Sequence, residues 1–149
     1  MKKNKLSLWI ILACLVLVAV FAAFHLSNRV KVPENAILVE KGEKTDYIDL
    51  NALDLSLVEG EMINGKGEVK QVSGDGLLLR DAIDYQQTQD INQIQIVADD
   101  EYSATLEASE VFDEDKVYLL VEDGNASLYV SGDKNSKRNV SNVKQIILQ

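Results

Sequence analysis

The chain has 149 residues, 24 of them acidic and 15 basic, and a formal net charge of −9, which is the length of one domain once its N-terminal stretch is set aside. The charge is divided unevenly, because residues 1–31 hold five basic residues and no acidic one, so that residues 33–149 carry −14. This negative charge disfavours nucleic-acid binding, in which cationic side chains neutralise phosphates.

The first element in the chain is a long apolar stretch. Every residue in 8–24 is apolar, and the stretch extends to 6–26 if one serine and one histidine are included. As a helix, 6–26 would rise about 31 Å at ~1.5 Å per residue, which matches the hydrocarbon core of a bilayer. Three lysines in the basic leader 1–5 favour a cytoplasmic N-terminus. The sequence therefore predicts a single-pass signal anchor in the cell membrane, with the C-terminal part extracytoplasmic.

Three other interpretations of this stretch were weighed. A cleavable signal peptide could be cut after Val20-Phe21-Ala22, but such peptides have a shorter apolar region. Cys14 follows Ile11-Leu12-Ala13, as in a lipoprotein signal, yet ten more mostly apolar residues come after it. A buried core helix conflicts with the basic flanks and the terminal position. The length of the run favours a permanent anchor.

The remainder of the chain is predicted to be a tether followed by one domain. Residues 27–35 are mostly polar and include Pro33, which limits how far a helix can continue out of the membrane. Residues 36–149 are expected to fold as an α+β domain, dominated by mixed β-sheet with one main helix. At this length the domain can bury a core without disulfides.

Alternating patterns and turn signals predict the order of elements in this domain. Strands at 36–39 and 47–50 flank a turn, and strands at 61–63 and 68–72 flank Asn64-Gly65-Lys66-Gly67, a strong hairpin signal. Apolar residues at helical spacing predict an amphipathic helix over roughly 77–87. Further strands are expected at 93–98, 102–106, 117–121 (a central strand), 127–130 and 143–148, with a turn at Asp123-Gly124-Asn125.

Few residues in this domain could perform catalysis. Cys14 and His25, the only cysteine and histidine, both lie in the predicted anchor, which excludes a Ser–His–Asp or Cys–His arrangement outside it. The acidic clusters 99–101 and 113–115 could offer oxygen ligands to a hard cation, but neither has the spacing of a calcium loop. They are interpreted as solvated turns, and no catalytic residue or metal ligand is predicted.

One basic patch is expected near the C-terminus of this acidic domain. It comprises Lys134, Lys137, Arg138 and Lys144. Such a patch could hold an anionic ligand or contact anionic lipid headgroups. The alternative is a solvated loop whose charge offsets that of acidic neighbours.

From about residue 57 to the end, several segments resemble, in order, motifs of the molybdopterin-binding domain of the sulfite oxidase family. Gly76–Ile83 is similar to the family's G-V-P-L-x-D-L-L, and Asp100–Leu106 to its D-G-Y-x-x-x-L. Val117–Gly124 is similar to a strand that ends in Asn-Gly, Ser131-Gly132 to Pro-Gly, and Asn142-Val143-Lys144 to a closing V-K-W run. The resemblance implies the fold of that domain.

The departures from the family pattern concern its metal and cofactor site. The family holds molybdenum through a cysteine before G-V-P-L, whereas the comparable turn here, Ile63-Asn64-Gly65-Lys66, has none, and no other residue there replaces a soft thiolate. The family's arginine is absent from 127–129, and Gln145 stands in place of tryptophan. Among charged residues of the closing run, only Lys144 remains as a candidate cofactor contact.

We therefore interpret the chain as a membrane-anchored relative that kept the fold and lost the metal site. It would act as an extracytoplasmic binding or interaction module, without catalysis, without a cofactor and with a protein partner in the envelope. The first alternative is a minimal molybdopterin-dependent oxidoreductase, or its redox partner, that holds the pterin through backbone groups and Lys144. The second is a structural component of an envelope or transport complex.

Overall fold

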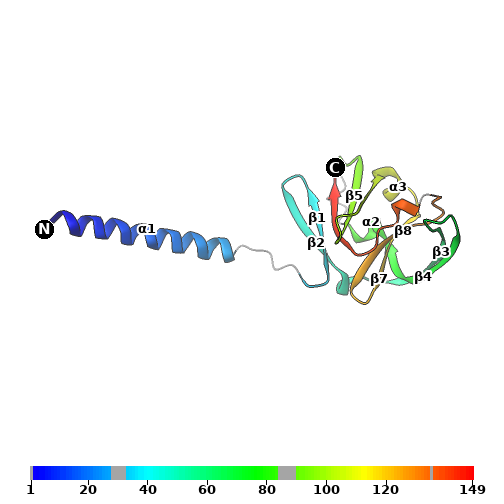
Figure 1. Cartoon of the computed structure of the whole chain (residues 1–149), viewed down its shortest axis with the longest axis horizontal. Helices are drawn as coiled ribbons and strands as arrows, with labels where there is room; N and C mark the ends of the chain where they lie inside the picture. Colours follow the sequence, from blue (N-terminus) through cyan, green and yellow to red (C-terminus); the bar gives the residue numbers. More distant parts are fainter. Residues whose placement is uncertain (1, 28–32, 84–89, 135) are drawn as a thin grey trace. The chain divides into compact units, whose positions relative to one another are not determined.

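A computed structural model describes residues 2–27, 33–83, 90–134 and 136–149, and it divides the chain into two compact units, Met1–Val32 and Pro33–Gln149 (Figure 1). The first unit is the helix α1, Lys2–Ser27, whose described side chains, 10–24, are all exposed. Judged by length and hydropathy together, no helix within the described residues reaches what a membrane crossing requires. Most of the predicted tether, 28–32, lies outside the described residues.

The second unit contains a mixed five-stranded sheet in the order β2-β1-β9-β5-β6. β1 and β9 run parallel and all other neighbours antiparallel. The strands are β1 (Ala36–Lys41), β2 (Lys44–Asp49), β5 (Gln93–Ala98), β6 (Ser103–Glu107) and β9 (Val143–Leu148). The hairpin predicted around residues 41–44 is confirmed as β1–β2, where Gly42 adopts a φ of 59°, a backbone conformation that glycine tolerates without a steric penalty.

The remaining strands form an antiparallel four-stranded sheet in the order β3-β4-β7-β8. They are β3 (Ser56–Ile63), β4 (Val69–Leu78), β7 (Val117–Glu122) and β8 (Asn125–Val130). The hairpin predicted at Asn64-Gly65-Lys66-Gly67 is confirmed, with longer strands than expected, and β7 is an interior strand as predicted. The prediction of an α+β domain is therefore correct, but the β-structure is divided into two sheets.

Both sheets bury residues in one hydrophobic cluster. Ile37 and Ile146 of the five-stranded sheet, and Leu119 and Leu128 of the four-stranded sheet, are at most 2% exposed in this cluster. In β5 the predicted alternation is confirmed, because Ile94, Ile96 and Ala98 are buried while the residues between them are not. Such a period-2 pattern buries one face of a strand. The two sheets therefore share a single core.

The helix predicted over roughly 77–87 is mostly wrong among the described residues. Leu77 and Leu78 belong to β4, paired with Leu119 and Tyr118 of β7, and only the single turn α2, Leu79–Ala82, is helical. A run of consecutive leucines fits both a buried strand and a helix, so periodicity alone could not separate them; here pairing with β7 decides. The rest of the predicted helix, 84–87, lies outside the described residues.

Besides α2, three short helical segments lie in the described part of the second unit. The 3₁₀-helix η1 (Leu50–Ala52) links β2 to β3. The helix α3 (Ala108–Phe112) follows β6, and the 3₁₀-helix η3 (Ser136–Arg138) precedes β9. The prediction of one main helix is therefore wrong for the described residues, because short turns of helix connect the strands instead. The acidic cluster 99–101 forms an exposed turn, as predicted, and 113–115 is an exposed segment after α3.

Candidate functional site

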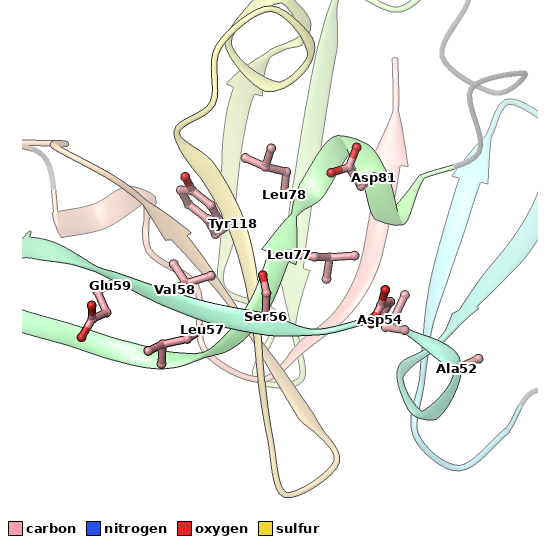
Figure 2. Close-up of a pocket in the computed structure, with 11 residues that line it drawn as sticks. Ala52, Asp54, Ser56, Leu57, Val58, Glu59, Leu77, Leu78, Asp81 and Tyr118 are labelled. Carbon is pink, nitrogen blue, oxygen red and sulfur yellow. The ribbon is translucent and has the colours of Figure 1, made fainter.

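An open groove runs beside the first half of β3. Its volume is about 740 Å³, and it is lined by residues from the link before β3, from β3 itself, from the end of β4, from α2 and from β7 (Figure 2): Ala52, Leu53, Asp54, Ser56, Leu57, Val58, Glu59, Leu77, Leu78, Asp81 and Tyr118. Three of these residues are exposed carboxylates, Asp54, Glu59 and Asp81, and none of the described lining residues is basic. The groove therefore combines apolar side chains with polar and negatively charged ones.

The backbone of β3 faces this groove at an unpaired sheet edge. The turn bond from Asn64 N–H to the Glu68 carbonyl, at 2.9 Å, together with the register of β3 and β4, places the ladder bonds at Ser56, Val58 and each second residue after them. In an antiparallel pair the intervening residues point their N–H and C=O groups the other way. The backbone groups of Leu57 and Glu59 thus point outward, and no bond joins them to another described residue.

A tyrosine from the opposite edge of the same sheet closes the remainder of the β3 edge. Tyr129 of β8 is 2% exposed, and its hydroxyl donates to the outward-facing carbonyl of Glu61 at 2.9 Å. A Cβ on Gly60 would lie 2.2 Å from the Tyr129 hydroxyl oxygen, so glycine is required for this close approach. The four-stranded sheet is therefore curled, with its first and last strands in contact, and the open part of β3 ends near Glu59.

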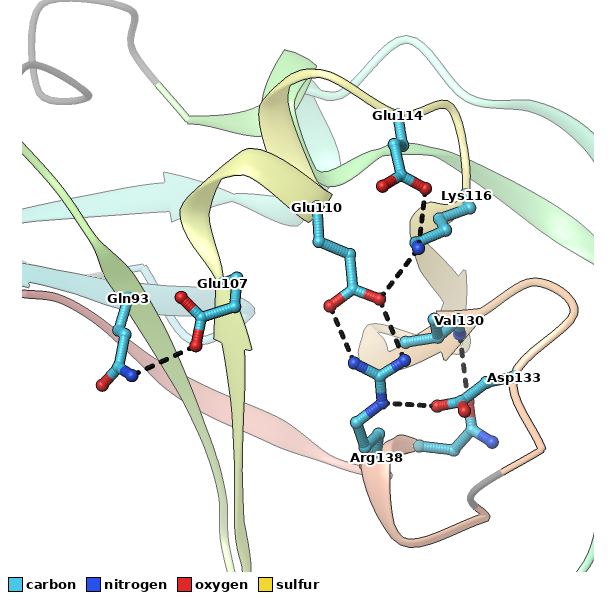
Figure 3. Close-up of polar contacts among 9 residues, drawn as sticks. Gln93, Glu107, Glu110, Glu114, Lys116, Val130, Asp133 and Arg138 are labelled. Carbon is cyan, nitrogen blue, oxygen red and sulfur yellow. Dashed lines mark hydrogen bonds and ion pairs between the residues drawn. The ribbon is translucent and has the colours of Figure 1, made fainter.

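A partly buried ionic cluster lies where α3, β7 and the segment before β9 meet (Figure 3). Arg138 donates two hydrogen bonds to the carboxylate of Glu110, at 2.7 and 2.9 Å, and a third to Asp133 at 2.6 Å. Lys116 bridges Glu110 at 3.1 Å and Glu114 at 2.7 Å. The Glu110 side chain is only 11% exposed, and a buried charge needs such partners. This cluster joins residues 110–116 to residues 133–138, which are distant from them in the sequence.

The contacts in this cluster shift the pKa values of Glu110, Lys116 and Arg138 toward their charged forms. Burial by itself would raise the pKa of Glu110, but the hydrogen bonds from Arg138 and Lys116 and the attraction of both cations outweigh it, so the pKa lies below its ordinary value of 4.5. Hydrogen bonds to Glu114 and then Glu110 raise the pKa of Lys116. The pKa of Arg138 is also raised, first by Glu110 and then by Asp133. The two cations of the cluster pair with its three carboxylates, and these pairs hold residues 110–116 against residues 133–138.

Within the predicted basic patch, Arg138 pairs with Glu110 and Asp133. The Lys137 carbonyl accepts a hydrogen bond from the Tyr102 hydroxyl at 2.5 Å. Lys134, Lys137 and Lys144 are exposed, and Lys144, the candidate cofactor contact, does not line the groove beside β3. A role of these three lysines in binding an anion stays a prediction.

The turn compared with the family's cysteine segment has a structural explanation. The Asn64 side-chain oxygen accepts hydrogen bonds from the backbone N–H groups of Lys66 and Glu68, at 2.9 and 3.0 Å, and its amide donates to the Glu68 carboxylate at 2.8 Å. An asparagine that bonds to the following backbone is a common means of stabilising a turn. Asn64 is therefore committed to the hairpin.

A second groove, of about 650 Å³, opens where β4 separates from β7, and it is also acidic. Its lining includes Asp75, Glu122 and Asp123. Molybdopterin carries an anionic phosphate, which the carboxylates of either groove would repel and which needs cationic or N–H donors. The residues of these two grooves do not fit that cofactor. Among the described residues, no three histidine, cysteine, aspartate or glutamate side chains converge as a metal site would require.

Sequence reasoning missed both the groove and the ionic cluster. Glu110 and Arg138 are 28 residues apart, and Tyr129 and Glu61 are 68 residues apart, so no local spacing links them. In β3, which borders the groove, Leu57 is 65% exposed, and only the structure shows this exposure. An apolar side chain on the outer face of an edge strand is one recognisable sign of a contact surface.

Comparison with known proteins adds no relative to this description. No family model matches the chain, and a search of curated proteins finds no match.

Proposed function

We propose that this protein is a membrane-anchored extracytoplasmic interaction module, derived from a sulfite-oxidase-like domain and without catalysis of its own. The observation that carries the proposal is the groove beside β3, where an apolar lining lies next to the outward backbone groups of Leu57 and Glu59. Pockets that combine apolar area with a few placed polar groups are suited to binding. Residues 33–149 contain no cysteine and no histidine, so nucleophilic and imidazole chemistry is not available there.

The proposed anchor rests on the sequence of residues 1–26. The helix α1 covers Lys2–Ser27, its apolar run is uninterrupted over 8–24, and basic residues flank it on both sides. Hydrocarbon requires that all backbone polar groups be bonded within the segment, as they are in a helix. Lysines at the N-terminal end favour an inward N-terminus, so the second unit would lie outside the cytoplasm.

The proposed relation to the sulfite oxidase domain rests on the order of the motifs. Gly76–Leu78 ends β4, Asp123-Gly124 forms the turn between β7 and β8, and Val143-Lys144 begins β9. The substitution of the family's cysteine turn by Ile63-Asn64-Gly65-Lys66 supports a loss of the metal site, because no thiolate is present. The same fold carries unrelated functions in many proteins, so the activity of the family does not transfer with it.

Chemical analysis of the full chain, purified from its own host, tests the proposal against its alternatives. We expect no molybdenum by elemental analysis and no pterin fluorescence after denaturation. Stoichiometric molybdenum or pterin would overturn the proposal in favour of an oxidoreductase. Cross-linking in cells should recover a partner whose capture depends on the groove; a constant assembly that survives loss of the groove would instead favour a structural role in an envelope complex.

Topology can be tested with an added thiol. Glu43 lies in the exposed β1–β2 turn, and Cys14, the only native cysteine, lies within α1. A Glu43→Cys variant should react in intact cells with a membrane-impermeant maleimide, and a cysteine placed at Lys3 should react only after the cells are opened. The reverse pattern, or release of the protein from membranes by carbonate, would contradict the proposed anchor.

A further inference from the structure

The open edge of β3 is short and well defined. It begins at Ser56 and is closed near Glu61, whose carbonyl is already bonded to Tyr129. Between these limits the outward N–H and C=O groups of Leu57 and Glu59 have no partner among the described residues. A strand edge of this kind can pair with an extended chain through main-chain hydrogen bonds. The available edge would accept a segment of about four residues, at ~3.3 Å per residue.

The side chains around this edge determine which extended chain would fit. The exposed Leu57 and the partly buried Leu53, Leu77 and Leu78 each contribute apolar surface to the groove. Carboxylates border the same groove at Asp54, Glu59 and Asp81. Asp81 lies 3.9 Å from Arg80, whereas no ion pair joins Asp54 or Glu59 to another described residue. Leu57 and Glu59 are two residues apart and lie on the same face of β3, so the side chains of a bound strand on that face would meet both an apolar group and a negative charge.

We propose that this groove binds an extended cationic segment of a partner protein, which adds as a strand to the edge of β3. The inference rests on the proposed function, because it specifies what the interaction module recognises. Main-chain bonds would form with Leu57 and Glu59, apolar side chains of the segment would contact leucines that line the groove, and lysine or arginine would face the carboxylates. Complementary charge of this kind directs association and excludes anionic competitors.

Charge also argues against the other occupants of such an edge. Pairing of β3 with β3 of a second copy would bring Glu59 of both chains to the same short edge, and like charges on facing strands destabilise a sheet. Anionic lipid headgroups and nucleic acids would meet the same carboxylates. A cationic peptide is the occupant that the charge distribution favours.

The direct test measures binding of a fluorescent six-residue peptide of alternating lysine and valine to the full chain in zwitterionic detergent. A control peptide has glutamate in place of lysine, and a second control has the same side chains but N-methylated interior amides, which removes the N–H donors. We expect binding of the first peptide, no binding of the glutamate peptide, and at least about tenfold weaker binding of the N-methylated peptide, since each main-chain bond contributes ~1 kcal/mol.

Variants of the protein locate the binding. Asp54→Asn combined with Asp81→Asn should weaken the lysine–valine peptide about threefold to tenfold, because each exposed ion pair contributes ~0.2–1 kcal/mol. The control variant combines Glu40→Gln with Glu43→Gln in the β1–β2 hairpin. It removes the same number of negative charges away from the groove and should change binding by less than about twofold. Leu57→Pro, which removes an outward N–H and keeps the ladder bonds to β4, should weaken binding more than Leu57→Ala.

Three results would overturn the inference. They are equal binding of the N-methylated and unmodified peptides, equal losses in the hairpin control and the groove variant, and dimerisation through β3. The N-methylated peptide keeps the test valid even if Leu57→Pro fails to fold. If cross-linking in cells recovers a partner whose capture is reduced by Leu57→Ala but not by the Asp54/Asp81 variant, the inference of a cationic partner fails while the proposed function stands. Molybdenum in the purified protein would instead remove the proposed function.

Discussion

Glu110 is the most constrained charged residue of the domain. It is 9% exposed, and its carboxylate receives a bidentate hydrogen-bond pair from Arg138 and an ion pair from Lys116. Charge-assisted bidentate bonds are among the strongest in proteins. A buried carboxylate that lost these partners would pay the cost of desolvation without compensation. Glu110 therefore makes the position of η3 depend on that of α3.

We predict that the contribution of Glu110 to the stability of the fold depends on pH. Because the pKa of Glu110 is lower in the folded chain than its ordinary 4.5, its contribution is fully present above that value and is lost as the pH falls through the folded-state pKa. Glu110→Gln should lower the free energy of unfolding at pH 7 by about 1–3 kcal/mol. The difference from the native chain should shrink as the pH falls from about 5 to 3.

Denaturant unfolding of the full chain in detergent, followed by near-ultraviolet circular dichroism of the tyrosines, measures this effect. Glu114→Gln is the matched control, since Glu114 also pairs with Lys116 but its side chain is 56% exposed. We expect its effect to stay within about 0.5 kcal/mol. The prediction would be contradicted if Glu110→Gln lowered the free energy of unfolding by the same amount at pH 7 and at pH 3.

The β3–β4 hairpin is the element on which the candidate site depends. Before Gly76, β4 pairs with β3 alone, because its pairing with β7 covers only Gly76–Leu78. The far half of the hairpin is held against β8 by Tyr129, which stacks on Tyr118 with ring centroids 6.1 Å apart. An isolated two-stranded ribbon is only marginally stable in water. The contact with Tyr129 therefore stabilises the far half of the hairpin.

We predict that the approach of Tyr129 to Gly60 limits substitution there. Gly60→Ala should destabilise the chain by about 1–3 kcal/mol, because the added methyl would overlap the tyrosine hydroxyl. Gly74→Ala on the same hairpin is the control, since a Cβ there meets nothing within 4 Å. Combining Gly60→Ala with Tyr129→Phe should cost less than the sum of the two single changes. Denaturant unfolding measures all four variants, and strict additivity would refute the contact.

In the whole molecule, the two sheets share one core, and the chain passes from one sheet to the other several times. β1 and β2 belong to the five-stranded sheet, β3 and β4 to the other, and β9 returns to pair with both β1 and β5. The isolated bridge between Leu128 and Val140 connects β8 to the segment before β9. Neither sheet can bury its apolar face without the other, because the buried residues of both form one cluster.

We therefore predict that Pro33–Gln149, produced without α1, folds alone and unfolds in one cooperative transition. This unit has its own core, and its length is typical of domains that satisfy two-state behaviour. Thermal unfolding followed by far- and near-ultraviolet circular dichroism should give the same midpoint by both probes. Separate midpoints would mean that the two sheets are independent, and a molten chain would mean that α1 is needed for folding.

Prediction from sequence succeeded where a pattern is local. The alternation in β5 and the Asn64-Gly65 turn each identify an element because side-chain periodicity and turn chemistry act over a few residues. It failed at Leu77–Ala82, where three leucines in a row fit either strand or helix. It missed α3 because Ala108–Phe112 is a single turn, too short to show a helical period.

The sequence by itself determined the strand order along the chain, the absence of thiolate and imidazole chemistry from residues 33–149, and the apolar character of residues 8–24. Only the tertiary structure decided that Arg138 binds Glu110 and not a ligand, that Tyr129 closes part of the β3 edge, and that the open part of this edge faces an acidic groove. The reason is physical: periodicity and turn propensity act between near neighbours, whereas partner choice and edge exposure depend on how the sheets curl and pack over one core.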